Sequence, residues 1–139
     1  MWLAFACLSV LLINGCASHA EGPAANPAAG LQIRGLIIEN QTKMWVSTAR
    51  LLVPATGGFV SCGTINPQSF CATTFPERSY SGNTVEISWT QGQQMYSSGK
   101  FELELPDGID IDRPARVRVI ISAPGSAGAI IVQDKESRQ

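Results

Sequence analysis

The chain has 139 residues, of which 45% are hydrophobic and 15% charged, and its ten basic and eleven acidic residues leave a formal net charge of −1 at pH 7. This length suits one ordinary domain with a single hydrophobic core. The near-neutral balance argues against a nucleic-acid partner, because phosphate neutralisation needs clustered positive charge.

An apolar run over residues 2–13 opens the chain and ends at Asn14-Gly15, directly before Cys16. Twelve residues rise about 18 Å as a helix, which is short of the roughly 30 Å hydrocarbon core of a membrane. No second apolar block extends the run, so a permanent transmembrane helix is not expected. The pattern instead predicts a signal peptide over residues 1–15.

The segment Ile13-Asn14-Gly15-Cys16 resembles the lipobox of bacterial lipoproteins. The resemblance implies that residues 1–15 are removed and that the Cys16 thiol carries lipid, with palmitate among its acyl groups. Ala17 and Ser18 are similar to the residues that follow the cysteine in lipoproteins of the outer membrane. This implies a cell-envelope protein that faces the periplasm. The alternative is an ordinary secreted protein whose signal contains cysteine.

Residues 16–30 are predicted to form a lipidated, flexible tether, since they are rich in Ala, Pro and Gly and nearly uncharged. As a coil, the tether would separate the domain from its lipid by about 20 Å, and when extended by at most about 45 Å. Residues 31–139 are then expected to form one domain that works close to its membrane.

The four cysteines divide by position. Cys7 lies in the signal and Cys16 is the lipid site, which leaves Cys62 and Cys71. An even pair in an exported domain is expected to form a disulfide. Closing a loop of about ten residues is worth roughly 2.5 to 3 kcal/mol, enough to pin one local loop. No metal site is predicted, because the single histidine, His19, lies in the tether far from both cysteines.

From residue 31 onward, short runs of alternating apolar and polar residues are separated by turn residues, and no window shows a helical period. The clearest runs are 85–90, 100–105 and 116–122, and weaker strand candidates are 31–39, 44–53, 70–75 and 129–133. This pattern predicts an all-β fold, an immunoglobulin-like or transthyretin-like antiparallel β-sandwich of about seven strands. A small β-barrel is the alternative. Trp89 falls on an apolar phase and is predicted to lie in the core.

No catalytic or cofactor motif is found. With His19 in the tether, no Ser-His or Cys-His couple is expected inside the domain. The polar phase of the predicted strands holds Glu86, Glu102 and Glu104, where a solvated face is expected rather than general acid–base chemistry. The three aspartates of residues 107–112 do not follow the calcium-loop order and predict an acidic turn. We therefore expect that the protein is not an enzyme and that it binds no cofactor and no metal ion.

Two stretches, 75–83 and 91–98, combine aromatic with polar residues and are predicted to be loops. The candidate binding residues in them are Arg78, Tyr80, Asn83, Gln93 and Tyr96. Arg and Tyr anchor contacts because they offer large area and hydrogen bonding for little loss of entropy. Since the loops of a sandwich cluster at its ends, both stretches are expected to share one rim with the Cys62–Cys71 loop.

The alternative interpretation of this surface is structural. It packs Tyr80 as a corner tyrosine and pairs Arg78 with Glu77 or a backbone carbonyl.

Together these observations lead to the hypothesis of a membrane-tethered, non-catalytic binding or assembly module that contacts another envelope protein. The alternative is a lipoprotein that binds peptidoglycan or another polysaccharide, with Trp45, Tyr80 or Tyr96 as stacking platforms and Asn83, Gln93 and Gln94 as hydrogen-bonding groups. A flat row of exposed aromatics would favour the sugar polymer. An unpaired edge strand or a hydrophobic patch would favour the protein.

Overall fold

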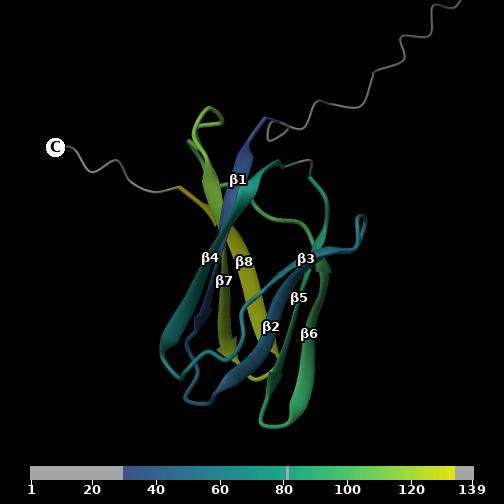
Figure 1. The fold of residues 1–139 in the computed structure, drawn as a ribbon, viewed down its shortest axis with the longest axis vertical. Coiled ribbons are helices and arrows are strands. Elements are labelled where there is room, and N and C mark those ends of the chain that lie inside the picture. Colours follow the sequence, from purple (N-terminus) through teal and green to yellow (C-terminus); the bar gives the residue numbers. More distant parts are fainter. Residues whose placement is uncertain (1–29, 81, 134–139) are drawn as a thin grey trace, which may run out of the picture.

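The structure of the chain, a computed structural model, describes residues 30–80 and 82–133. Within these residues the chain forms eight β-strands and no helix (Figure 1). The strands are β1 (Gln32–Asn40), β2 (Val46–Val53), β3 (Gly58–Ser61), β4 (Ser69–Ser79), β5 (Val85–Gln91), β6 (Gln94–Phe101), β7 (Ala115–Ala123) and β8 (Ser126–Val132). The predicted signal peptide, Cys16 and nearly all of the tether lie outside the described residues.

The described strands form two four-stranded sheets, which pack as a sandwich and do not close into a barrel. The order is β4-β1-β7-β8 in the first sheet, called sheet A, and β3-β2-β5-β6 in the second, called sheet B. The predicted all-β sandwich is confirmed, with eight strands in place of about seven.

One strand pair in these mainly antiparallel sheets is parallel, a feature that the sequence did not predict. Strands β1 and β7 run in the same direction, with Ile38 beside Val119. A parallel pair needs a long crossover, and here the chain between the two strands builds all of sheet B and β4. The first strand therefore lies inside sheet A, between β4 and β7.

The hydrophobic core lies between the two sheets and is built by alternate residues of the inner strands. These include Leu36 and Ile38 of β1, Val85, Ile87 and Trp89 of β5, and Val117, Val119 and Ile121 of β7. Because side chains alternate across a strand, each of these strands turns one apolar face inward. Trp89 is 1% exposed, which confirms its predicted place in the core.

Strand β6 corrects two predictions. The stretch 91–98 is not a loop but a two-residue turn followed by the first half of β6. Gly92 and Gln93 both have positive φ, 58° and 67°, as tight hairpin turns require. The predicted strand over 100–105 ends at Phe101, after which Glu104 makes an isolated parallel bridge with Ile130 of β8. The apolar and polar residues of 100–105 alternate because the Leu103 side chain is buried in the core where the chain passes from sheet B to sheet A.

Strands β3 and β4 also differ from the prediction. The four residues of β3 were not predicted as a strand, because Gly58 and Ser61 give them no clean alternation. Strand β4 runs eleven residues to Ser79, so half of the predicted loop 75–83 is strand. Its pairing with β1 shifts register between Ile33 and Gly35, which lets Pro76 fit into the strand at an irregular position.

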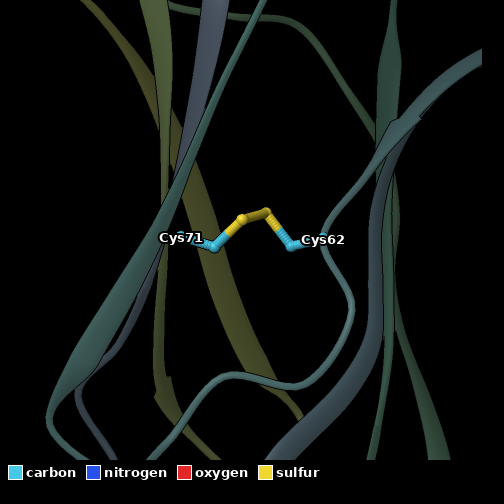
Figure 2. The surroundings of a disulfide bond; sticks show 2 residues. All are labelled: Cys62 and Cys71. Atoms are coloured by element: carbon cyan, nitrogen blue, oxygen red, sulfur yellow. A yellow bond between two sulfur atoms is a disulfide. The ribbon is translucent and has the colours of Figure 1, made fainter.

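The Cys62–Cys71 disulfide is present, as predicted, with the two Cα atoms 6.2 Å apart. It is not a staple of one local loop. Cys71 belongs to β4 of sheet A, whereas Cys62 directly follows β3 of sheet B. Figure 2 shows the sulfur atoms spanning the space between the two layers. A bond between residues only nine positions apart in sequence thus joins the edges of both sheets.

The two ends of the sandwich are named here by their chain features. At the entry end the chain enters β1, and the hairpin end holds the tight β5–β6 and β7–β8 turns.

The hairpin end is closed by a buried polar network around Asn40, which is 0% exposed. Its Nδ2 donates to the carbonyl oxygens of Met44, Ile65 and Asn66 at 2.8, 3.2 and 3.1 Å. Its Oδ1 accepts from the hydroxyl and backbone nitrogen of Thr42.

Candidate functional site

A cavity of about 780 Å³ lies between the sheets toward the entry end. This volume falls within the roughly 300–1,000 Å³ of typical small-molecule sites. Its lining comes from both layers, with β2, β3 and β5 of sheet B facing β1, β4 and β7 of sheet A. The candidate functional site is this cavity together with the adjoining edge of β4.

The interior of the cavity is apolar. Its walls and floor are made by Ile33, Leu51, Val53, Val60, Phe75, Val85, Leu103 and Val117. Residues on its lining that are exposed to solvent mark its mouth: Thr56, Gly58, Phe59, Glu77, Arg78 and Ser79. An apolar interior with a few polar groups at the opening is the usual arrangement of a ligand site.

Two local features keep the mouth open. On one side, β2 ends in a turn in which the backbone nitrogens of Thr56 and Gly57 donate to the Val53 carbonyl oxygen at 3.1 and 2.9 Å. This turn brings the chain back as β3, which is only four residues long. On the other side, the irregular pairing around Pro76 reshapes the last third of β4. The disulfide then sets how closely β3 and β4 approach.

Tyr80 joins the cavity wall to the chain that follows β6. Its hydroxyl donates to the Leu103 carbonyl oxygen at 3.3 Å, and its backbone nitrogen donates to the Leu31 carbonyl oxygen at 2.8 Å. Burial raises the pKa of the phenol, and the nearby negative charge of Glu102 raises it further. The side chain thus packs in the way that the structural interpretation of Tyr80 expected.

The structure brings together some of the predicted binding residues and separates others. Arg78, Tyr80 and Asn83 line the cavity toward the entry end. Gln93 forms the β5–β6 turn, and Tyr96 follows two residues into β6. Because β5 spans the length of the sandwich between these groups, they lie at opposite ends. The predicted single rim is therefore wrong, since stretches taken as loops are largely strands.

The three aromatic residues proposed as a sugar platform, Trp45, Tyr80 and Tyr96, do not form a flat row. Tyr96 is half-buried and stacks on Trp89, with ring centroids 5.6 Å apart. Tyr80 is also half-buried, at the other end of the sandwich. Trp45 is 59% exposed and lies next to β2 at the hairpin end. Of the three proposed platforms, only Trp45 presents most of its ring to solvent.

The predicted acidic turn is present in residues 107–112. The backbone nitrogen of Arg113 donates to the Asp110 carbonyl oxygen at 3.2 Å, and that of Asp112 donates to Asp110 Oδ1 at 3.0 Å. In the part of the chain that the structure describes, no group of three His, Cys, Asp or Glu side chains is placed to hold a metal ion.

The edge of β4 was missed by sequence reasoning. β4 is the outer strand of sheet A and pairs on one side with β1. Its first seven residues carry no charge and no proline, and Phe70 is 66% exposed. Natural proteins protect long edge strands with charge, proline or a covering segment. Here Pro76, Glu77 and Arg78 protect only the end of β4, and no strand of the described chain pairs with the outer side of the residues before them.

The buried network of Asn40, Thr42 and Gln91 was also missed. Gln91 Nε2 donates to Thr42 Oγ1 at 2.6 Å, and Trp89 Nε1 donates to Gln91 Oε1 at 3.4 Å. A signal was present, because Gln91 continues the inward phase of Val85, Ile87 and Trp89. Sequence spacing gave no indication that Thr42, 49 residues away in the connection between β1 and β2, is the partner of Gln91.

Comparison with known proteins adds one structural neighbour. No family model matches the sequence, and a search of curated proteins found no match. The chain is similar to a protein from Eubacterium rectale whose structure was determined by NMR, with 10% identity and a TM-score of 0.44. The alignment covers 76% of this chain and 91% of that one.

In residues 30–80 and 82–133, no helix is long and apolar enough to cross a membrane.

Proposed function

We propose that this chain is a lipid-anchored protein of the bacterial cell envelope that binds another envelope protein and catalyses no reaction. The apolar run of residues 2–13 and the Cys16 that follows it support the anchor. The Cys62–Cys71 disulfide supports export, since such bonds persist in oxidising compartments. Ala17 and Ser18 support attachment to the outer membrane, facing the periplasm.

The observation that carries the binding role is the free edge of β4. Among the described residues no strand pairs with the outer side of β4, and Ser69 to Phe75 present their outward backbone groups there without the charges that keep edges apart. An extended segment of a partner protein can add to such an edge as the next strand, with main-chain hydrogen bonds providing affinity. The exposed side chains of Phe70, Ala72 and Thr74 on alternate positions would provide specificity.

The anchor is tested by mass spectrometry of the protein extracted from membranes. We expect a new amino terminus at Cys16 that carries acyl mass, and residues 62 and 71 joined by a disulfide. The Cys16→Ser variant is expected to lose the acyl mass and its retention in the membrane fraction as a processed protein. An unprocessed wild-type chain, or a processed chain without lipid, would contradict the anchor.

The partner is tested by photo-crosslinking in cells, with a photoreactive amino acid in place of Ala72. We expect one discrete adduct, reduced several-fold when Thr74→Lys adds a charge to the same edge. The matched controls lie on β6, the outer strand of sheet B: a photoreactive residue in place of Lys100, and the variant Met95→Lys, whose position is 75% exposed. Equal adducts from both edges, or no adduct from Ala72, would remove the support for this role.

Binding to a cell-wall polymer is the second candidate, and the exposed ring of Trp45 is the observation that favours it. Sedimentation with isolated peptidoglycan separates the two. We expect the protein to stay in the supernatant. Sedimentation of the wild type that is lost in Trp45→Ala would favour the polymer instead.

A further inference from the structure

We propose that the cavity between the sheets takes one acyl chain of a phospholipid from the membrane that holds the protein, with the zwitterionic headgroup at the cavity mouth. This proposal goes beyond the protein partner of β4 and assigns a ligand to the cavity itself. It rests on the proposed lipid anchor for its geometry, and on the cavity lining for its chemistry.

The cavity interior suits a hydrocarbon chain. Its walls and floor carry aliphatic and aromatic side chains, apart from Tyr80 and the half-buried amide of Asn83. The Tyr80 hydroxyl is already bonded to the Leu103 carbonyl oxygen, so it does not require a polar ligand group inside. Removing a chain of CH₂ groups from water is favourable by about 0.8 kcal/mol for each group buried. The volume of about 780 Å³ admits a ligand of this size.

The cavity lies at the end of the domain where the chain that follows Cys16 enters β1. The described chain begins at Gly30, and Leu31 is bonded through its carbonyl oxygen to the backbone nitrogen of Tyr80 on the cavity wall. Ile33, two residues further, lines the cavity. Only fourteen residues separate Cys16 from Leu31, a length that spans at most about 45 Å. A lipid leaving the bilayer would therefore meet this end of the sandwich first.

The charges at the mouth match a zwitterionic headgroup. Arg78 and Glu77 both line the cavity, and both are exposed. A guanidinium binds phosphate through charge-assisted hydrogen bonds, and a carboxylate accepts hydrogen bonds from an ammonium group. Phosphatidylethanolamine carries both a phosphate and an ammonium group. A free fatty acid has only a carboxylate, which would satisfy Arg78 and leave Glu77 beside a like charge.

The experiment uses the mature chain, residues 16–139, with Cys16→Ser, so that its own acyl groups do not compete for the cavity. The protein is incubated with phosphatidylethanolamine vesicles, separated from them, and examined by native mass spectrometry. We expect one phospholipid per chain. We also expect a photoreactive group near the methyl end of the acyl chain to label residues of the interior, such as Leu51, Val60 and Phe75.

Variants locate the ligand. Val60→Trp fills the cavity from the edge strand β3 and is expected to lower binding at least tenfold, whereas Leu52→Trp, outside the cavity lining, is expected to leave it unchanged. Arg78→Ala is expected to weaken binding several-fold, and Lys43→Ala, an exposed residue between β1 and β2, is the charge-matched control. If Val60→Trp fails to fold, the labelling pattern in the otherwise unaltered Cys16→Ser chain still decides the result.

The proposal is overturned if no lipid stays with the protein, if labels fall outside the cavity, or if a free fatty acid binds as well as the phospholipid. This assay measures phospholipid binding in the cavity, and its result does not depend on whether Cys16 is acylated in cells. Failure of the lipid anchor would instead appear in the mass of the native amino terminus, so the two failures are distinguishable.

Discussion

Asn40 holds the hairpin end of the sandwich together with one side chain. The two N–H groups of its amide lie within hydrogen-bond distance of three carbonyl oxygens. That of Met44 lies in the connection between β1 and β2, and those of Ile65 and Asn66 lie in the connection between β3 and β4. Buried carbonyl groups are costly when they lose their donors, more costly than the net gain from forming the bonds. A polar residue at the end of an otherwise apolar strand face is therefore part of the fold.

We predict that Asn40→Ala lowers the free energy of unfolding by about 3 kcal/mol, because the carbonyl oxygens that lose their donor have little access to water. Urea denaturation measures the change. Gln41→Ala is the control: this neighbour is exposed and its side chain bonds only Glu39, so the change is expected to stay within about 0.5 kcal/mol. Equal effects from both variants would contradict the role of Asn40.

Tyr80 makes stability depend on alkaline pH. Burial, and then the charge of Glu102, raise the pKa of its phenol in the folded protein above the ordinary value of 10.0. The neutral phenol is therefore favoured by folding. This stabilising contribution is complete below pH 10 and is lost as the pH rises through the pKa of the folded state.

The expected result is that, as the pH rises above 10, the free energy of unfolding declines more steeply in the wild type than in Tyr80→Phe. Denaturation series across this range measure the difference. A Tyr80→Phe protein with the same slope as the wild type would show that Tyr80 is not the group responsible.

At the scale of the element, edge position explains why two strands escaped prediction. Strands β3 and β6 are the outer strands of sheet B, where polar side chains are tolerated on both faces. Their sequences lose the period of two that marks β5 and β7, which are covered on one face by the core. The alternation of apolar and polar residues in the inner strands predicted which of their faces is buried. The two outer strands of sheet B lack this signal, because their small and polar residues interrupt the alternation.

The β5–β6 hairpin supplies a prediction at this scale. Gln93 has φ of 67°, a left-handed conformation that glycine adopts without steric cost. We predict that Gln93→Gly raises the free energy of unfolding by about 0.5 to 1 kcal/mol, after the greater flexibility of glycine in the unfolded chain is deducted. Gln94→Gly, in the adjoining strand, is expected to lower it. Thermal unfolding of the two variants gives the comparison, and a loss of stability in Gln93→Gly would refute the argument.

At the scale of the whole molecule, the disulfide joins two layers whose edge strands are otherwise separate. Cys62 and Cys71 link β4 to the chain that follows β3 (Figure 2). The cross-link therefore sets the spacing of the sheets on the flank where the candidate site lies. On the opposite flank, the chain after β6 crosses to β8 and performs the same task without a covalent bond.

We predict that removing the disulfide, as Cys62→Ala together with Cys71→Ala, lowers the free energy of unfolding by about 2 to 4 kcal/mol while the sandwich still forms. Hydrogen exchange is expected to increase most in β3 and β4 and least in β5 and β7. Uniform loss of protection throughout the described strands would mean that the bond supports the entire core rather than this flank.

By itself, the sequence determined the all-β class, the core strands, the pairing of Cys62 with Cys71 and the acidic turn. The fold class, the core strands and the turn follow from the local spacing of residues. The disulfide follows because only two cysteines remain in the predicted domain. Only the tertiary structure decided the parallel pairing of β1 with β7, the buried partners of Asn40, the cavity and the free edge of β4. Each of these depends on segments far apart in the chain. Local alternation states which face of a strand is buried, but it does not state which strand lies beside it.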